Sequence, residues 1–188
     1  TFNRYVHVFD VKSNACYTFP NNEHLFGSPI DIAIDKKGSI YVSDSKEGVV
    51  KVFKNYGREY VREIGRGVLE RPTGLAVNEK TEELLIVDTV RSDILRYDLH
   101  DYHLKGMIGR SGSEAGMFHY PTNIFISRDG LIFISDSLNF RIQIFTPDGK
   151  FLRAFGTAGD SPGYFSRPKG VAVDSDGNVY VADAMADT

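Results

Sequence analysis

The stretch "RPKGVAVDSDGNVYVAD", residues 167–183, decides the fold because it recurs along the chain. Two short runs rich in valine flank the dipeptide Asp176-Gly177, a pattern that predicts a β-hairpin with a tight turn. Three similar stretches occur earlier: "SPIDIAIDKKGSIYVSD" from Ser28, "RPTGLAVNEKTEELLIVD" from Arg71 and "YPTNIFISRDGLIFISD" from Tyr120. Self-similarity at this spacing is typical of a repeat protein.

Three positions stand in register in all four copies. They are a proline that opens the first strand (Pro29, Pro72, Pro121, Pro168), an aspartate that closes the second (Asp44, Asp88, Asp136, Asp183) and a large apolar residue three positions before the proline (Phe26, Leu69, Phe118, Phe165). We interpret the aspartates as structural: each carboxylate would accept backbone N–H groups in the next loop, and Asp136 could also pair with Arg141. The apolar residues are expected to form core between neighbouring repeats.

Each full copy continues with two more strands, such as "RIQIFTP" and "FLRAFG" after the third hairpin. Apolar residues occupy both faces of the first two strands, so we expect these sheets to be covered on both sides. Four-stranded antiparallel sheets repeated at this spacing are the pattern of a β-propeller. The second copy lacks the turn glycine and is one residue longer, at "NEKTEE", so its turn must be built differently.

The segments "GDSPGYFSRPKGVAVDSDGNVYVAD" and "GSEAGMFHYPTNIFISRDGLIFISDSLNFRIQIFTPDGKFLRAFG" closely resemble NHL repeats. That pattern runs as a glycine-rich loop, phenylalanine, proline, "GVAVD", "GNVYVAD", and then asparagine and arginine before "IQVF". The resemblance covers Phe26 to Thr188. It is weaker in the first copy, where "SKEGVVKVF" lacks the asparagine and arginine, and in the second, which has "TVRSDILRY". It implies an all-β propeller, and NHL propellers usually have six blades.

The repeats divide the chain into one domain with full blades at 26–66, 69–109 and 118–156. Residues 1–20 are interpreted as the second half of a blade and residues 165–188 as the first half of another. Two architectures fit: an arc of a six-bladed ring, which we favour, or a closed four-bladed ring in which the two halves share a blade. An arc leaves apolar surface bare at about 25 cal/mol per Å². It therefore needs missing blades or a neighbouring chain to cover its open ends.

Composition narrows the function classes. The 188 residues are 41% hydrophobic and 25% charged, which is typical of a globular domain, and the net charge of -3 makes nucleic acid an unlikely partner by charge alone. No apolar run approaches the roughly 20 residues of a membrane span. Cys16 is the single cysteine, so no internal disulfide can form.

The chain begins at Thr1, and we expect a processed product or a piece of a longer protein. Of the possible compartments we favour an extracellular or periplasmic one.

Three motifs suggest chemistry, and each has a simpler explanation. "GDSPG", residues 159–163, matches a nucleophile elbow, but Ser161 precedes a proline in a loop and lacks the required strand and helix. "DSDGN", residues 174–178, resembles a calcium loop, but Met185 stands where glutamate is needed. His100 and His103 could share a metal, yet the sequence shows no third ligand. His7, His24 and His119 occupy no common repeat position, unlike the channel histidines of zinc-dependent lyases with this repeat. We therefore expect no catalytic residues, metal or cofactor.

We expect binding residues at the positions where the four repeats differ in sequence. These positions lie in loops that gather near one mouth of a propeller. The candidates give that face basic and aromatic character: Arg71, Arg91, Tyr120, Asn123, Arg141, Arg167 and Lys169. The predicted function is a non-enzymatic scaffold that presents this face to a protein, peptide or glycan. Two alternatives remain open: an enzyme of lyase or lactonase type with a site in the channel, and single-stranded RNA binding through basic and aromatic side chains.

Overall fold

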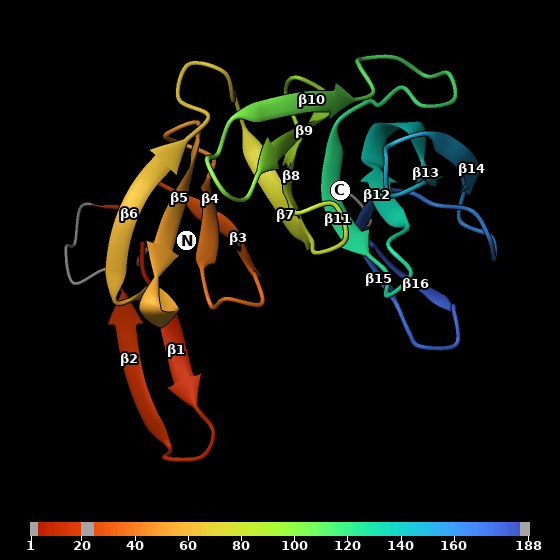
Figure 1. The fold of residues 1–188 in the computed structure, drawn as a ribbon. Coiled ribbons are helices and arrows are strands. Elements are labelled where there is room, and N and C mark those ends of the chain that lie inside the picture. Colours follow the sequence, from red (N-terminus) through yellow and green to blue (C-terminus); the bar gives the residue numbers. More distant parts are fainter. Residues whose placement is uncertain (1–3, 20–24, 185–188) are drawn as a thin grey trace.

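The computed structural model describes residues 4–19 and 25–184, and this part of the chain is all-β (Figure 1). It contains three four-stranded sheets, two two-stranded sheets and two short 3₁₀ turns, η1 (Asn55–Gly57) and η2 (Ser137–Asn139). The described residues include no helix long and apolar enough to cross a membrane. The predicted class, a β-propeller of four-stranded antiparallel blades, is confirmed.

Every complete sheet follows the chain, with each strand pairing antiparallel to the next. The first sheet contains β3 (Pro29–Ile34), β4 (Ile40–Asp44), β5 (Val49–Lys54) and β6 (Glu59–Ile64). The second contains β7 (Pro72–Asn78), β8 (Glu83–Asp88), β9 (Asp93–Asp98) and β10 (Leu104–Ile108). The third contains β11 (Pro121–Ile126), β12 (Ile132–Asp136), β13 (Arg141–Phe145) and β14 (Phe151–Phe155). We call these sheets blades one, two and three.

The two-stranded sheets lie at opposite ends of this row of blades (Figure 1). One is β1 (Val6–Asp10) with β2 (Ala15–Phe19), and the other is β15 (Pro168–Val173) with β16 (Val179–Asp183). They do not pair with each other in the described part of the chain, so the alternative of a closed four-bladed ring is not what the structure has. The extreme ends of the expected half-blades, residues 1–3 and 185–188, and also His24 lie outside the described residues.

The hairpin turns explain the sequence pattern between the first and second strands. Gly38, Gly130 and Gly177 have φ angles of +80°, +91° and +88°, a region that glycine enters without steric cost. Blade two, which lacks this glycine, places Glu82 there instead, with φ of 52°. Its longer turn is fastened by Asn78, whose Oδ1 accepts the N–H of Lys80 at 3.1 Å.

Neighbouring blades pack face to face through apolar clusters that alternate with the sheets. Tyr41 and Val52 of blade one pack with Leu75 and Leu84 of blade two. Corresponding clusters join blade two to blade three and blade three to the β15–β16 hairpin. The first strands β3, β7, β11 and β15 contact one another in order and form the inner rim of the arc. Blade two has a neighbour on each side, and its first two strands are apolar on both faces, as the sequence predicts.

Polar bonds also join the inner strands of successive blades. The Ser43 hydroxyl donates to the carbonyl of Thr73 at 2.7 Å, and the Thr89 hydroxyl donates to the carbonyl of Pro121 at 2.7 Å. Two residues after the proline, Asp31 accepts the backbone N–H of Leu75 at 2.8 Å in the same direction around the arc. These bonds link the inner strands of successive blades and so hold each blade against the next.

Candidate functional site

The antiparallel course of the strands gives the arc two faces. The loops that precede each proline and the loops that follow each second strand come to one end of the blades, which we call the loop face. The turns between first and second strands and between third and fourth strands come to the opposite end, which we call the turn face. The seven candidate binding residues belong to the loop face or to strand ends beside it.

The carboxylates of the four closing aspartates hold the loops of the loop face in place by accepting their backbone N–H groups. Asp44 accepts the N–H groups of Gly27 and Ser28 at 2.7 and 2.9 Å. Asp88 accepts those of Glu70 and Arg71, and Asp183 those of Ser166 and Arg167. These donors lie in the loop before the proline, and Asp44 and Asp88 also accept an N–H from the loop that follows them. Asp44 and Asp88 thus each fasten two loops at once.

Blade three extends this arrangement with side chains. Asp136 is fully buried, and its Oδ2 lies 2.9 Å from the Nε of Arg141 and 2.9 Å from the Nε2 of Gln143. Its Oδ1 accepts the N–H of His119 at 2.7 Å. Arg141 also donates to the carbonyls of Glu114 and Met117 at 2.8 and 2.9 Å. The guanidinium is therefore committed to the scaffold and has little left to offer a ligand.

Arg91 of blade two is committed in a similar way. Its Nη2 and Nε donate to the two carboxylate oxygens of Asp93 at 2.8 and 3.2 Å, and its Nη1 donates to the carbonyl of Val68 at 3.2 Å. The hydrogen bond to Asp93 raises the pKa of Arg91, so the side chain keeps its charge. Arg91 and Arg141 thus both bind a carboxylate and loop carbonyls of the scaffold, although both were candidates for ligand contact.

Arg71 and Tyr120 meet across the boundary between blades two and three. The Nη1 of Arg71 donates to the hydroxyl oxygen of Tyr120 at 2.9 Å, and this is an exposed contact. Tyr120 is half-buried and has a φ of 58°, which turns its side chain out of the strand direction. Because a guanidinium has five donors and this bond uses one, Arg71 keeps most of its hydrogen-bonding capacity directed at solvent.

The next step around the arc brings Arg167 and Lys169 to the same face. Lys169 is exposed and Arg167 is half-buried, and neither forms an ion pair among the described residues. Asn123, in contrast, faces the neighbouring blade, since its Oδ1 accepts the N–H of Val171 at 3.2 Å. The structure therefore separates the seven candidates. Arg71, Tyr120, Arg167 and Lys169 face outward, whereas Arg91, Asn123 and Arg141 hold the scaffold.

The "DSDGN" stretch forms the hairpin turn on the turn face. One carboxylate oxygen of Asp174 accepts the N–H groups of Asp176 and Asn178, and the other accepts the amide of Asn178 and the hydroxyl of Tyr180. These bonds, first of all those from Asn178, lower the pKa of Asp174 to about 2. The turn's own donors occupy the oxygens that a calcium ion would need.

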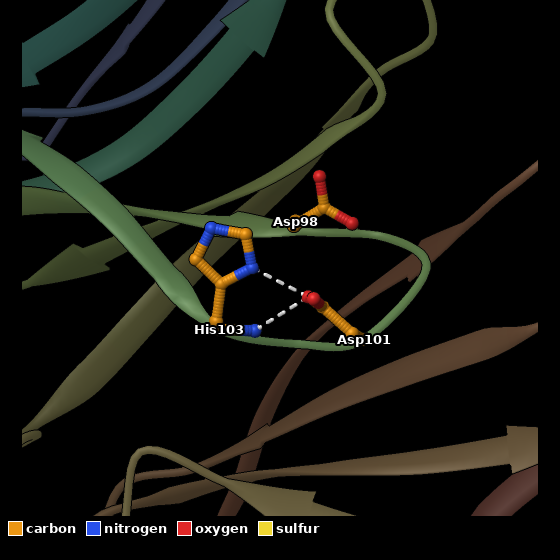
Figure 2. A group of neighbouring side chains, drawn as sticks. All are labelled: Asp98, Asp101 and His103. Carbon is orange, nitrogen blue, oxygen red and sulfur yellow. Dashed lines mark hydrogen bonds and ion pairs between the residues drawn. The ribbon is translucent and has the colours of Figure 1, made fainter.

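A cluster of Asp98, Asp101 and His103 lies in the turn between β9 and β10 (Figure 2). Their ligand atoms all lie within 4.8 Å of one another. The sequence suggested His100 and His103 as a possible metal pair without a third ligand and favoured a solvated loop, and in the structure the two side chains have different partners. His103 faces Asp101, at 2.6 Å from Nδ1 to Oδ1, whereas His100 contacts Glu82 at 3.2 Å. The group is largely exposed, and Asp98 also has Lys105 at 3.7 Å, so the geometry is that of a solvated turn.

The "GDSPG" stretch is a compact loop before the β15–β16 hairpin. Ser161 is exposed, and its carbonyl accepts the N–H of Tyr164 at 2.9 Å. Gly159 and Phe165 close the loop through a backbone bond of 3.1 Å. A nucleophile elbow places its serine between a strand and a helix, and neither stands beside Ser161 here.

Several residues with structural roles escaped the sequence reasoning. Glu83 is buried, and nitrogens of Arg96 and Lys105 lie 2.8 and 3.0 Å from its carboxylate oxygens. Asp31 and Asn123 link successive blades through their side-chain oxygens. The sequence did contain a pattern that pointed to Asp31 and Asn123. Both stand two positions after the proline of their repeat, where the other two copies have Gly74 and Gly170. No repeat pattern in the sequence pointed to Glu83, Arg96 and Lys105.

Comparisons with known proteins agree with this architecture. A family model described as a 6-bladed beta-propeller matches residues 18–126 and 112–188. Tripartite motif-containing protein 2 of Rattus norvegicus is 30% identical over 134 residues, which are 71% of this chain and 16% of that protein. RING finger protein nhl-1 of Caenorhabditis elegans is 38% identical over 52 residues, which are 28% of this chain and 5% of that protein.

Solved structures show the same fold at low identity. Virginiamycin B lyase from Staphylococcus aureus superposes with a TM-score of 0.73 and 13% identity, over 96% of this chain and 57% of that one. A protein of unknown function from Bacteroides thetaiotaomicron gives 0.61 and 21%, over 96% and 50%. The chain thus spans about half the length of these structures and a smaller share of the curated relatives. By its family model and its repeats, the chain belongs to the 6-bladed β-propeller family and is a propeller of NHL type.

Proposed function

We propose that this propeller is a binding scaffold whose loop face receives an acidic segment of a protein or peptide. The observation that carries the proposal is the pairing of Arg71 with Tyr120 across two blades, at 2.9 Å, beside Arg167 and Lys169 on the next step of the arc. These cations have no carboxylate partner among the described residues, in contrast to Arg91 and Arg141. Guanidinium groups with free donors are suited to carboxylates, and tyrosine adds apolar contact area.

The scaffold beneath this face supports the proposal because it is rigid. Asp88 fastens the loop that carries Arg71, and Asp183 fastens the loop that carries Arg167. Tyr120 is held by its own backbone N–H, which donates to the hydroxyl of Ser92 at 3.4 Å. A preorganised loop loses little conformational entropy when a ligand binds, and this lowers the cost of association.

The test is selection of a peptide ligand followed by comparison of matched charge reversals. A displayed random-peptide library is panned on the purified chain, and the affinity of a selected peptide is measured by titration calorimetry. Arg71→Glu and Arg167→Glu are each expected to weaken binding about tenfold or more, because a lost charge-assisted bond is worth about 1.5–3 kcal/mol. Arg128→Glu is the control, since Arg128 is an exposed arginine on the turn face. Equal losses in all three variants would refute the loop-face site.

Two other functions remain testable on the same protein. Single-stranded RNA binding would use the same cations and Tyr120, and affinity for oligouridylate that falls steeply with salt would favour it over a peptide ligand. An enzyme of lyase or lactonase type would use the channel lined by the inner strands. The support for this alternative is that the fold is similar to that of virginiamycin B lyase from Staphylococcus aureus. The two sequences are 13% identical in that comparison. Turnover that survives Arg71→Glu would favour this alternative.

A further inference from the structure

The loop that carries Tyr120 is built differently from its counterparts in the other repeats. In the other three copies the closing aspartate accepts the N–H groups of both residues before the proline: Gly27 and Ser28, Glu70 and Arg71, and Ser166 and Arg167. In blade three, Asp136 accepts the N–H of His119. The N–H of Tyr120 instead donates to the hydroxyl of Ser92 on blade two, at 3.4 Å. Tyr120 is therefore displaced from the position that its repeat equivalents occupy.

Two further backbone features show the same displacement. The residue after a closing aspartate donates its N–H to the carbonyl of the residue before the proline, as Thr89 does to Arg71 at 3.1 Å. In blade three this bond is shifted by one residue on each side, and Leu138 donates to the carbonyl of His119 at 3.0 Å. Of the four described residues that precede a repeat proline, Tyr120 is the one with a positive φ, at 58°. A tyrosine enters this region at a steric cost, so the displacement needs a cause.

The cause lies in the acceptor capacity of Asp136. An ionised carboxylate has about four acceptor sites. His119 occupies one of them on Oδ1. Three side-chain donors occupy Oδ2: Asn139 at 2.8 Å, Arg141 at 2.9 Å and Gln143 at 2.9 Å. These four donors fill the carboxylate, so the N–H of Tyr120 would be a fifth donor and bonds elsewhere.

Gln143 distinguishes blade three from blade two at this carboxylate. Its side chain is fully buried, its Nε2 also donates to the carbonyl of Met117 at 2.6 Å, and its Oε1 accepts the N–H of Gly116 at 2.9 Å. The corresponding residue of blade two is Leu95, which has no side-chain donor. There the residue before the proline, Arg71, keeps its N–H bond to the closing aspartate. A buried donor at this strand position therefore goes together with the displaced loop.

The displacement brings a tyrosine hydroxyl to the guanidinium of Arg71. Nη1 of Arg71 donates to the hydroxyl oxygen of Tyr120 at 2.9 Å, in an exposed contact. Because the oxygen is the acceptor in this bond, the hydroxyl proton can be donated to a further group, and Arg71 has four other N–H donors. Two donors of different side chains thus stand side by side on the loop face. This arrangement suits the two oxygens of one carboxylate.

Building on the proposed function of the loop face, on which this inference rests, we propose that Gln143 is its positioning residue and that Arg71 and Tyr120 together bind one carboxylate of the ligand. Gln143 fills the last acceptor site of Asp136 and so keeps Tyr120 displaced. The guanidinium of Arg71 then donates to one oxygen of the ligand carboxylate, and the hydroxyl of Tyr120 donates to the other. Gln143 is buried and acts through Asp136 and Tyr120, without contact to the ligand.

The first test removes the tyrosine hydroxyl alone. The probe is an acetylated hexaglutamate amide, and its affinity for the whole chain is measured by titration calorimetry. Tyr120→Phe is expected to weaken binding about tenfold or more, because a hydrogen bond to a charged group is lost while the ring remains. Tyr56→Phe is the control and should bind as the parent does, since Tyr56 is an exposed tyrosine at the turn face.

The second test frees an acceptor site on Asp136. Gln143→Leu matches blade two and should return Tyr120 to a negative φ, which three-bond couplings measured by nuclear magnetic resonance report. The affinity for hexaglutamate should fall about tenfold. In this background Tyr120→Phe should weaken binding no further, because both changes act on the same contact. Asn139→Ala also frees a site on Oδ2 and takes the place of Gln143→Leu if near-ultraviolet circular dichroism shows that Gln143→Leu does not fold.

The outcomes separate this carboxylate site from the loop-face function as a whole. If Arg71→Glu weakens hexaglutamate binding no more than Arg128→Glu does, the proposed function of the loop face is wrong and the carboxylate site is wrong with it. If Arg71→Glu weakens binding and Tyr120→Phe does not, the shared carboxylate site is refuted while the loop-face function stands. A positive φ at Tyr120 that persists in the folded variants of Gln143 or Asn139 would overturn the positioning role.

Discussion

Asp136 and Arg141 form a 2.9 Å ion pair inside blade three, and the carboxylate is completely buried. The equivalent Asp183 is exposed and, within the described part of the chain, accepts two backbone N–H groups. We expect Asp136→Ala to lower the free energy of unfolding by about 3–5 kcal/mol, since it removes the buried carboxylate that accepts hydrogen bonds from both Arg141 and Gln143. Asp183→Ala should cost distinctly less in the same urea titration. Equal losses would show that the backbone bonds, and not the ion pair, account for the stability.

The buried carboxylate of Glu83 predicts a dependence on pH. Burial acts to raise its pKa, but hydrogen bonds from Arg96 and Lys105 outweigh burial and lower it. A depressed folded-state pKa stabilises the protein above the unfolded value of about 4.3 and ceases to do so as the pH falls through the folded value. Glu83→Gln should therefore cost about 2 kcal/mol at neutral pH, and the difference from the parent should shrink in acid.

Glu82→Gln is the control for Glu83, because the neighbouring carboxylate is exposed and forms its ion pair, at the surface, with His100. Urea denaturation curves of both variants at neutral and acid pH make the comparison. A Glu83→Gln penalty that stays constant down to the lowest pH would contradict an ionised Glu83.

Gly74 and Gly170 occupy the same repeat position with different neighbours. A Cβ at Gly74 would lie 2.9 Å from the Cα of Asn123 in the backbone of blade three. At Gly170 it would meet the Ala182 side chain at 3.5 Å, an ordinary contact. Gly74→Ala is expected to destabilise the chain by about 1–3 kcal/mol, as overpacking does, and to lower the melting temperature measured by calorimetry. Gly170→Ala should leave it nearly unchanged, and a similar fall in both would refute close blade contact as the cause.

The turn at Asp174 can be examined by nuclear magnetic resonance. Its carboxyl carbon should titrate with a pKa of about 2, because Asn178 and Tyr180 donate to the ionised form. Asn178→Ala removes the larger contribution and should raise the pKa toward the ordinary value near 3.9, whereas Tyr180→Phe should raise it less. A pKa that is unchanged in Asn178→Ala would show that the backbone alone sets it.

The sequence by itself determined the fold, the blade pattern and the places of the turns. The prolines, the Asp-Gly turns and alternating apolar residues act within one hairpin, so local physical rules suffice to read them. Only the tertiary structure decided which polar residues are free. The sequence already suggested that Asp136 pairs with Arg141, because the two residues lie close together in the chain, but it did not show that Arg71 reaches Tyr120 on another blade. The same holds for Ile32 and Leu75, whose exposure depends on a neighbouring blade. Contacts between blades join residues far apart in the chain, so the repeat pattern predicted the apolar core between blades but not these individual partners.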